Sequence, residues 1–407
     1  MPAVTDAPFR FSPPRLDWRP ELIWLLRRAF APNGPTALAL PAVAGEETVD
    51  LARRLDLASR VAARTARARL VAEIGETAAD RLAAERRAAA AQGVRVLALA
   101  ERIAGESEAL GARVALLKFA ALAARGVDMV GRRSVADLDL LASESDALRL
   151  TLRLRTLGFA PSSAPAPEQH LATLAGEDGV VEIHTRLLGV RLAGGRSATL
   201  AELEAAGCLA PWSEQPALSV PSREILVAHL LVHAFAQHAA APYAYPLLRG
   251  LGDLLDLRAV AGDSRAVAGW LERDLESADV TAILELVGVL ARGELGELAG
   301  RPDLWLRHAI SGAIDPDYVA ALRWTAATSP VPSDRSRWAR GWSSLAGLVF
   351  PSRLRLEAQH GRHASAWEIA RWRVARPFEL ARRALAAAVG RSRLAARGKR
   401  ERKSGHR

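Results

Sequence analysis

The chain has 407 residues, half of them apolar and a quarter charged, a composition typical of a soluble globular protein with about two or three domains. Its single cysteine, Cys208, excludes an intrachain disulfide and fits a reducing compartment. The net charge is +10, but residues 391–407 hold eight Arg or Lys and one Glu, so the rest of the chain carries about +3. This balance argues against the broad basic surface of a nucleic-acid-binding protein.

The sequence also argues against membrane insertion or export. The N-terminus lacks the apolar core of a signal peptide, and no run of about 18 uncharged apolar residues occurs. We therefore expect a cytoplasmic protein without a membrane span. Ala, Leu and Arg are abundant and aromatic residues are scarce, which favours helices.

The first part of the chain reads as an irregular start followed by helices. Residues 1–20 are rich in proline and are expected to be irregular, and the region 21–111 is expected to be helical. Helical spacing predicts three stretches there: 21–30; 47–92, as one or two long amphipathic helices; and 93–111, which ends at a glycine.

The pattern changes over residues 112–190, which read as a small α/β unit. Period and turn signals predict a strand, a helix, a strand, a helix and a hairpin, in that order. We expect Ser145 to cap the second helix and Gly158 to end it. The predicted elements are strands 113–118 and 134–142, helices 119–126 and 145–158, and a hairpin of 170–176 with 180–188.

Helices return in the last part of the chain. We predict a helical domain at 199–328, a linker at 329–334, a C-terminal helical region at 335–390 and a disordered basic tail at 391–407. The helices expected in the domain are 222–240, 245–261, 264–297 with a break, and 303–326. The predicted fold class is α+β, with a small mixed-sheet core embedded between a helical N-terminal region and a large helical C-terminal region.

Two predicted strands carry acidic residues that point to metal chemistry. Asp137 and Asp139 are two apart on one strand, and Glu182 and His184 are two apart on the other, so each pair shares a strand face. If the strands are neighbours, three carboxylates converge and raise one another's pKa unless a cation lies between them. Mg²⁺ suits such a cluster, because it binds a few carboxylates together with water and substrate phosphate. Two such ions suit in-line attack at phosphorus.

Other polar residues have weaker functional signals. An Asp-x-Asp pair in a Leu-rich strand also arises by chance, for instance where a strand end enters solvent. His229 and His233 share a helical face, which suits zinc, but no further ligand is evident. We expect His233 to line the cleft and His229 to be a packing or surface residue. His238 is also expected to be a packing or surface residue, and Asp253 and Asp256 to cap or pair on a helix.

The order and spacing of several segments are more specific than any one motif. Together they resemble the uncharacterised nucleotidyltransferase family of bacterial proteins within the polymerase-β-like superfamily. The segments are RVALLKFAAL (113–122), RRSVADLDLLAS (132–143), LRTLGFA (154–160) and VVEIHTRLL (180–188). The likeness extends over most of residues 20–390, with further segments at 232–257, 348–361 and 371–385.

The resemblance implies a nucleotidyltransferase-type core and a role for each matching residue. Asp137 and Asp139 would bind two Mg²⁺ ions, and Glu182 would complete the second ion's shell or take a proton from the acceptor hydroxyl. Lys118 would meet a phosphate as a point charge. Two further matches, Arg133 and His184, are placed beside the nucleotide.

The residues themselves leave the roles of these last two open. Arg133 precedes Asp137 by four residues and is expected to orient the strand or pair with a carboxylate rather than touch substrate. His184 either contacts substrate or is a hydrogen-bonded structural residue. The helix that ends at Gly158–Phe159 matches the family's Gly-aromatic pair.

One departure from the family pattern concerns phosphate binding. The glycine that follows the lysine in the family is Phe119 here. That glycine lies where phosphate oxygens approach backbone N–H groups, and a phenyl group would obstruct the approach. The metal acids are therefore intact, whereas the phosphate cradle is altered.

The resemblance implies transfer of a nucleotidyl group from an NTP, with ATP expected, to an acceptor hydroxyl in the presence of Mg²⁺ or Mn²⁺. The acceptor is a small molecule, a sugar, a peptide or a protein. The alternative is a catalytically degenerate member that acts as a binding or assembly factor in a biosynthetic pathway. A third hypothesis is an RNA-directed transferase that uses the tail 391–407.

Overall fold

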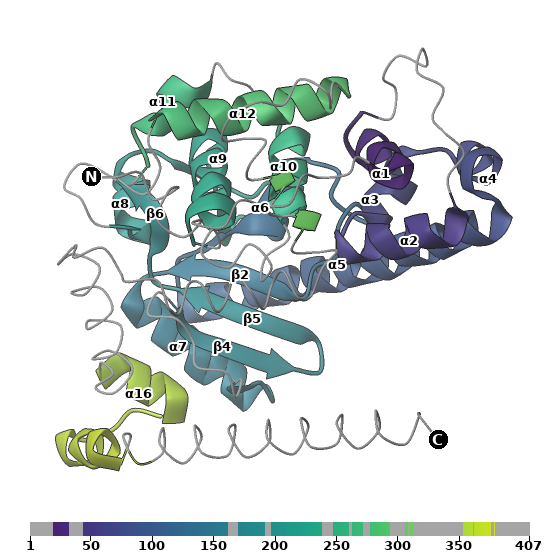
Figure 1. Ribbon diagram of the computed structural model, residues 1–407. Coiled ribbons are helices and arrows are strands. Elements are labelled where there is room, and N and C mark those ends of the chain that lie inside the picture. Colours follow the sequence, from purple (N-terminus) through teal and green to yellow (C-terminus); the bar gives the residue numbers. More distant parts are fainter. Residues whose placement is uncertain are drawn as a thin grey trace.

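The computed structural model is a seven-stranded mixed sheet flanked by helices, an α+β fold as the sequence predicts (Figure 1). The sequence predictions for residues 1–18, for the linker 329–334 and for the tail 391–407 lie outside the described residues, as does most of the helix expected at 303–326. The described residues are 19–31, 44–161, 170–191, 197–237, 247–259, 263–271, 277–293, 306–307, 310–311, 353–360, 362–375 and 378.

The N-terminal region contains more helices than the sequence predicts. The helix expected at 21–30 is confirmed. One or two helices are expected over 47–92 and another over 93–111, but the chain forms four helices there, and the last of them runs unbroken across the expected boundary at residues 92 and 93. Two of the three breaks between these helices contain a residue with positive φ, which interrupts a helix: Asp56 has φ of 56° and Gly75 has φ of 85°. The third break, at residues 65–66, has extended backbone at Thr65. The helices are α1 (Pro20–Phe30), α2 (Gly45–Arg54), α3 (Ala58–Arg64), α4 (Arg67–Ile74) and α5 (Glu76–Leu110).

The long helix α5 ends as predicted at Gly111. This glycine has φ of 58°, and its N–H donates to carbonyls of the last helical turn. The start of α2 packs tightly on the end of α4, because a Cβ added at Gly45 would lie 2.2 Å from the carbonyl oxygen of Ile74. Only glycine fits this crossing.

The α/β unit has the predicted order of strand, helix, strand, helix and hairpin, with a two-residue strand, β3, added before the hairpin. Strands β4 and β5 form the hairpin, with antiparallel pairing. Ser143, not Ser145, caps the second helix, because its hydroxyl accepts from the N–H of Asp146 at 3.1 Å. The elements are β1 (Val114–Leu116), α6 (Lys118–Ala124), β2 (Asp137–Ala142), α7 (Glu144–Thr156), β3 (Ala160–Pro161), β4 (His170–Gly176) and β5 (Gly179–His184).

The sheet extends beyond the part predicted from sequence. Its strand order is β3-β4-β5-β2-β1-β9-β8, and the last two strands form a hairpin at residues 209–221, before the predicted helices. β9 pairs with β1 in parallel. The additional elements are β6 (Leu187–Arg191) and β7 (Ser197–Ala198), which form a small second sheet, then α8 (Leu200–Ala205), β8 (Leu209–Pro211) and β9 (Leu218–Pro221).

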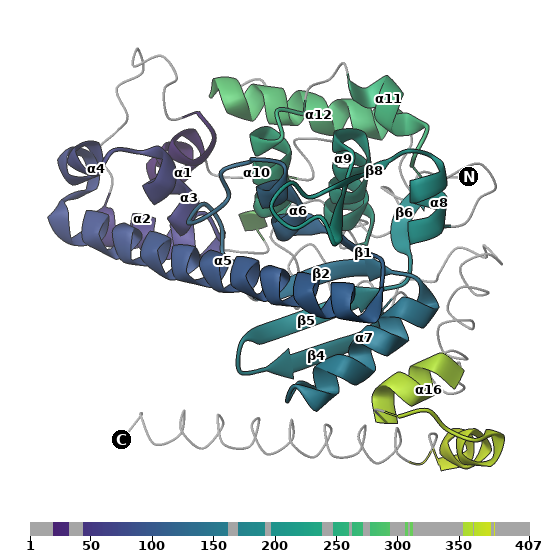
Figure 2. The same cartoon turned by 180° about the vertical axis from the view of Figure 1, so that it is seen from behind.

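Two helices cover one face of the main sheet and leave the acidic residues on the other. Figures 1 and 2 show α5 and α7 across the same face of β2, β4 and β5. Leu138, Leu140, Val181 and Ile183 are fully buried, and they alternate along β2 and β5 with the acidic and histidine positions. Alternation therefore places the polar side chains on the face opposite the apolar ones.

The C-terminal half adds helices to the same hydrophobic core. One large cluster of buried apolar residues extends from Leu22 in α1 to Ala358 in α16, and a small separate cluster consists of Leu356, Ala364, Ile369 and Trp372. Among the described helices, none combines the length and apolarity needed to cross a membrane. The helices are α9 (Arg223–Leu231), a π-helix η1 (Val232–Gln237), α10 (Leu247–Asp256), α11 (Ser264–Ala268), α12 (Ser277–Arg292) and α16 (Arg353–His360).

Candidate metal centre

The pairing of β2 with β5 brings three potential metal ligands together. The two strands are parallel, and Asp139 lies directly opposite Glu182 in the register. His184 follows Glu182 by two residues on the same strand face. One ligand atom from each of Asp139, Glu182 and His184 lies within 4.8 Å of the other two. The two strands are therefore neighbours, as the expected convergence requires, but the group that forms contains His184 and not the third carboxylate, Asp137.

Asp139 is the most heavily engaged of the acids. Its Oδ1 accepts from Lys118 Nζ at 2.6 Å and lies 2.9 Å from His184 Nε2. The side chain is 3% exposed. Burial alone would raise the pKa of this carboxyl, but Lys118 and His184 together hold it well below its usual range. Asp139 is thus a buried carboxylate held in its ionised form.

Lys118 reaches Asp139 from the first residue of α6, directly after β1. Its backbone has φ of 44°, a left-handed conformation that costs a residue other than glycine about 1–2 kcal/mol. Burial would lower the pKa of the ammonium, but Asp139, Asp137 and Glu182 raise it overall. The lysine is therefore charged, and its position between strand and helix directs it at the acids.

Glu182 and Asp137 have the opposite electrostatic environment from Asp139. Burial, followed by the nearby charge of Asp139, raises the pKa of Glu182 to about 7. The same two causes raise the pKa of Asp137. Asp137 begins β2, on the face of Asp139, but its carboxylate is not part of the group within 4.8 Å. Burying these carboxylates close together costs free energy, because their negative charges repel one another, and a bound cation would reduce that repulsion.

Arg133 pairs with a carboxylate, as the sequence suggests. Its guanidinium donates to Asp253 of α10, and both side chains are buried. Asp256, one helical turn later, accepts a bidentate pair from Arg60 at 2.7 and 3.0 Å. The expectation that both aspartates pair on a helix is confirmed. These contacts fix α10 against α3 and the segment that enters β2.

Sequence reasoning missed Arg249. This residue of α10 donates from Nε to Asp56 at 2.6 Å and from Nη2 to Ser134 at 3.0 Å. Its charge also opposes the rise in the pKa of Asp137. The available signal was its spacing, because Arg249 precedes Asp253 by four residues and so lies on the same helical face.

Phe119, which replaces the expected glycine, is buried in the core. Its ring lies close to α5, where a Cβ added at Gly93 would be 3.0 Å from the ring tip. The guanidinium of Arg133 lies 5.7 Å from the ring centroid. The aromatic side chain therefore packs between α5, α6 and the segment before β2. Its effect on phosphate binding stays a prediction.

The histidines of the helical region do not form a second metal cluster among the described residues. The rings of His229 and His233 stack with centroids 5.9 Å apart, and both are buried. His238 lies outside the described residues. The potential cluster that the described residues do form is Asp139, Glu182 and His184. The two stacked histidines are therefore packed in the core.

The Gly158–Phe159 pair ends α7 beside the hairpin. Gly158 has φ of 93°, and Phe159 is buried against the turn between β4 and β5. A Cβ added at Gly176 would lie 2.8 Å from the Phe159 ring. This contact locates the hairpin, and through it β5, relative to α7.

In a comparison with protein-family models, residues 41–295 match the model of the uncharacterised nucleotidyltransferase family. The search of curated proteins and the search of solved structures gave no match. The match covers the helices α2 to α5, the sheet with its acids, and the helices α9 to α12, and it begins after α1. The segments 348–361 and 371–385 lie beyond it, so their likeness to the family stays a prediction. Since the match spans more than half of the chain, the protein belongs to the uncharacterised nucleotidyltransferase family.

Proposed function

We propose that the protein transfers a nucleotidyl group from an NTP, with ATP as the expected donor, to an acceptor hydroxyl. Mg²⁺ or Mn²⁺ would be held by Asp137, Asp139 and Glu182. The observation that carries the proposal is the register of Asp139 opposite Glu182, which puts two acids of a nucleotidyltransferase family member side by side.

The residues present fit a divalent metal ion. Carboxylate oxygens and an imidazole nitrogen are suitable donors, and ligand atoms of Asp139, Glu182 and His184 lie within 4.8 Å of one another. Asp137 lies outside this group but on the same strand face as Asp139, from which it would join the metal's ligands. The raised pKa of Glu182 and of Asp137 reflects like charges in a buried place, which a dication would neutralise. When bound, the metal would neutralise phosphate charge and lower the pKa of the attacking hydroxyl.

The chain's own residues would position the reactants. Lys118 lies at the strand–helix junction, with its ammonium beside Asp139, and would bind a phosphate oxygen of the nucleotide as a point charge. Glu182 would either complete the shell of the metal ion or accept the proton of the acceptor hydroxyl. Its pKa of about 7 in the chain without metal suits the second role. His184 would hold the carboxylate of Asp139 in place.

Arg133 is better placed to support the site than to touch the nucleotide. Its guanidinium is buried and paired with Asp253. Arg133 lies four residues before Asp137, so its ion pair with Asp253 fixes the segment that leads into β2. We assign it a positioning role.

A second candidate function is that of a degenerate family member that binds a partner in a biosynthetic pathway. Phe119 in place of the phosphate-loop glycine favours it. The retained acids with their shifted pKa values favour the enzyme. The acceptor is open between a small molecule, a sugar, a peptide and a protein, and RNA bound through residues 391–407 is a further hypothesis.

Calorimetry with each NTP, in Mg²⁺ or Mn²⁺, tests the proposal. Binding that requires the metal and disappears in the Asp137→Asn/Asp139→Asn variant is the expected result. Asp50→Asn is the matched control, because it removes an exposed carboxylate on α2 and should leave nucleotide binding unchanged. Absence of binding to folded wild-type protein would favour the degenerate alternative. A variant that lacks residues 391–407 should bind ATP as the full chain does.

A further inference from the structure

A pocket rich in arginine lies at the other end of α6 from the candidate metal centre. Its volume of about 670 Å³ is in the range of small-molecule sites. Lys118 begins α6, whereas Arg125 follows its last turn and lines the pocket. At about 1.5 Å per residue, the two positions are about 10 Å apart along the helix axis. The pocket is therefore separate from the candidate metal centre, and its lining contains none of Asp137, Asp139 and Glu182.

The lining of this pocket has an excess of positive charge. Five arginines against two aspartates leave a net charge of +3. Burial, followed by the nearby charge of Arg60, lowers the pKa of Arg64 to about 10, with a smaller contribution from Arg132. The arginine is still charged at neutral pH. The charged residues of the lining are Arg64, Arg125, Arg132, Arg223, Arg258, Asp128 and Asp256.

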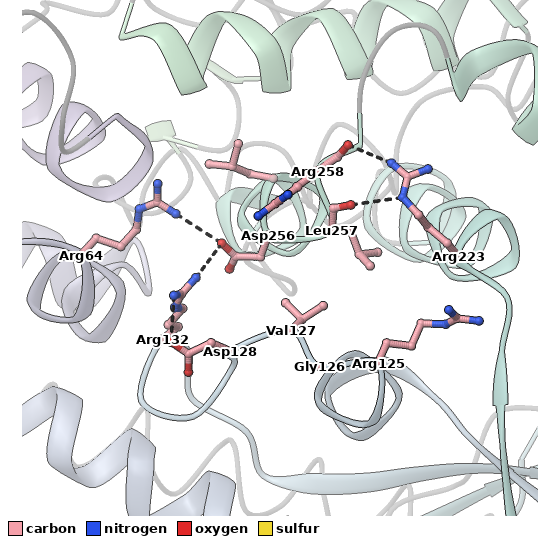
Figure 3. A pocket seen from close by; sticks show the side chains of 11 residues that line it. Arg64, Arg125, Gly126, Val127, Asp128, Arg132, Arg223, Asp256, Leu257 and Arg258 are labelled. Carbon is pink, nitrogen blue, oxygen red and sulfur yellow. Dashed lines mark hydrogen bonds and ion pairs between the residues drawn. The ribbon is translucent and has the colours of Figure 1, made fainter. Parts of the chain in front are cut away.

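Three of the arginines have structural partners (Figure 3). Arg64 and Arg132 each lie 3.3 Å from Asp256. Arg223 pairs with Asp263 at 2.8 Å and donates to the carbonyl oxygens of Leu257 and Arg258, which follow α10. These three side chains shape the wall of the pocket.

Arg125 and Arg258 are the two arginines left for a ligand. Both are exposed. Arg125 donates from Nε to the carbonyl oxygen of Pro221 at 2.6 Å. In the part of the chain that the structure describes, neither guanidinium forms an ion pair, although Arg125 lies near enough to Glu224 for its charge to help lower the pKa of that carboxyl. A guanidinium presents a planar fork of donors that matches phosphate in a bidentate way.

The ends of two helices explain part of the arginine excess, but not all of it. α6 and α10 both end at the pocket, and helix C-termini attract cations. Arg223 serves this purpose by capping carbonyls after α10. The side chain of Arg258 does not cap these carbonyls. Its backbone has φ of 55°, a conformation in which glycine is favoured at the end of a helix.

We propose that this pocket binds a small molecule with one or two phosphate groups, held by Arg125 and Arg258, independently of the metal centre. The positive charge comes from guanidinium groups, so binding requires no divalent ion. The phosphate group is common to a second nucleotide and to a phosphorylated acceptor. The two possible ligands differ in that a nucleotide carries a nucleobase, which would add to its binding, whereas a phosphorylated acceptor does not.

The test is calorimetry with the full chain in EDTA at low ionic strength, with pyrophosphate, ADP and ribose 5-phosphate as probes. We expect Arg258→Gly and Arg125→Gln each to weaken pyrophosphate binding about ten-fold or more, because each removes a charge-assisted contact. Arg258→Gly also relieves the left-handed backbone, so its stability should not fall. ADP binding tighter than pyrophosphate would identify a nucleotide, and tighter ribose 5-phosphate an acceptor.

Arg87→Ala is the matched control, because Arg87 is exposed on α5 and has no ion pair among the described residues. It should bind pyrophosphate as the wild type does. The proposal is overturned if wild-type protein binds none of the probes, or if both pocket variants bind like Arg87→Ala. It is also overturned if Asp139→Asn, but neither pocket variant, changes the affinity. Nucleotide binding in Mg²⁺ without EDTA reports separately on the metal centre.

Discussion

Glu182 has a carboxyl group that is harder to ionise in the folded chain than in the unfolded chain. Its pKa rises from 4.5 to about 7 because of burial and the charge of Asp139. Between these values the folded chain holds a proton that the unfolded chain has released. Stability from this group is therefore present below about pH 4.5 and is lost as the pH rises through about 7.

In EDTA, the free energy of unfolding of the wild type should fall more steeply between pH 5 and pH 7.5 than that of Glu182→Gln. Urea titrations at several pH values measure this difference. Parallel curves for the two proteins would show that Glu182 ionises normally. Glu85→Gln, which alters a carboxyl of α5 paired with Arg53, is the control and should keep the wild-type slope.

Lys118 is the other residue whose charge the site depends on. Lys118→Met leaves Asp139 buried without its ammonium partner, which should cost about 3–5 kcal/mol in EDTA. Mg²⁺ or Mn²⁺ should restore part of this loss, because a dication can neutralise the same carboxylate. Thermal unfolding with and without metal checks both effects. Equal stabilisation of wild type and variant by metal would contradict the shared role.

At this scale the sequence predicts that Asp139 and Glu182 meet, but it predicts neither the place of Arg249 nor how the groups are ionised. The two-residue spacing on each strand was sufficient to place Asp139 and Glu182 on one face, given neighbouring strands. The low pKa of Asp139 and the high pKa of Glu182 depend on Lys118 and on burial, which arise from the junction of β1 with α6. Such differences come from tertiary packing and have no local signal.

Among the elements, α7 tests the importance of a single cap. Ser143→Ala should destabilise the chain by about 1 kcal/mol, because it removes the acceptor for the N–H of Asp146. Ser145→Ala is the comparison. The hydroxyl of Ser145 lies 3.0 Å from Ser143 Oγ, but the hydroxyl that accepts the backbone N–H at the start of α7 is that of Ser143. Urea denaturation should therefore show the larger loss for Ser143; equal losses would mean that both serines share the cap.

The order of elements from β1 to β5 could be predicted because each has a strong local pattern. The hairpin of β4 and β5 has alternating residues around a turn, and α5 ends at a glycine. The hairpin of β8 and β9 was missed because its strands have three and four residues and contain proline. The sequence predicts fewer helices than α2 to α5, because a short break, such as the one around Asp56, hardly changes helical periodicity.

At the scale of the whole molecule, the N-terminal helices and the sheet share one core. We expect a fragment of residues 112–221 to be unfolded, because α5 covers the face of β2 and β5 (Figure 2). A fragment of residues 44–221, which includes α5, should recover ordered secondary structure. Circular dichroism during urea titration measures this. A cooperative transition for the shorter fragment would show that the predicted boundary at residue 112 separates two independent units.

The pairing of β2 with β5 has a consequence for the order of events during folding. Asp139 lies 21 residues after Lys118 and 45 residues before His184. Contacts between residues so distant in sequence form slowly, because a long loop must close first. A chain emerging from the ribosome therefore carries these groups as isolated, solvated side chains. We expect the chain to bind a metal only after β5 has been made and has paired with β2, so that metal binding would report the formation of this part of the sheet.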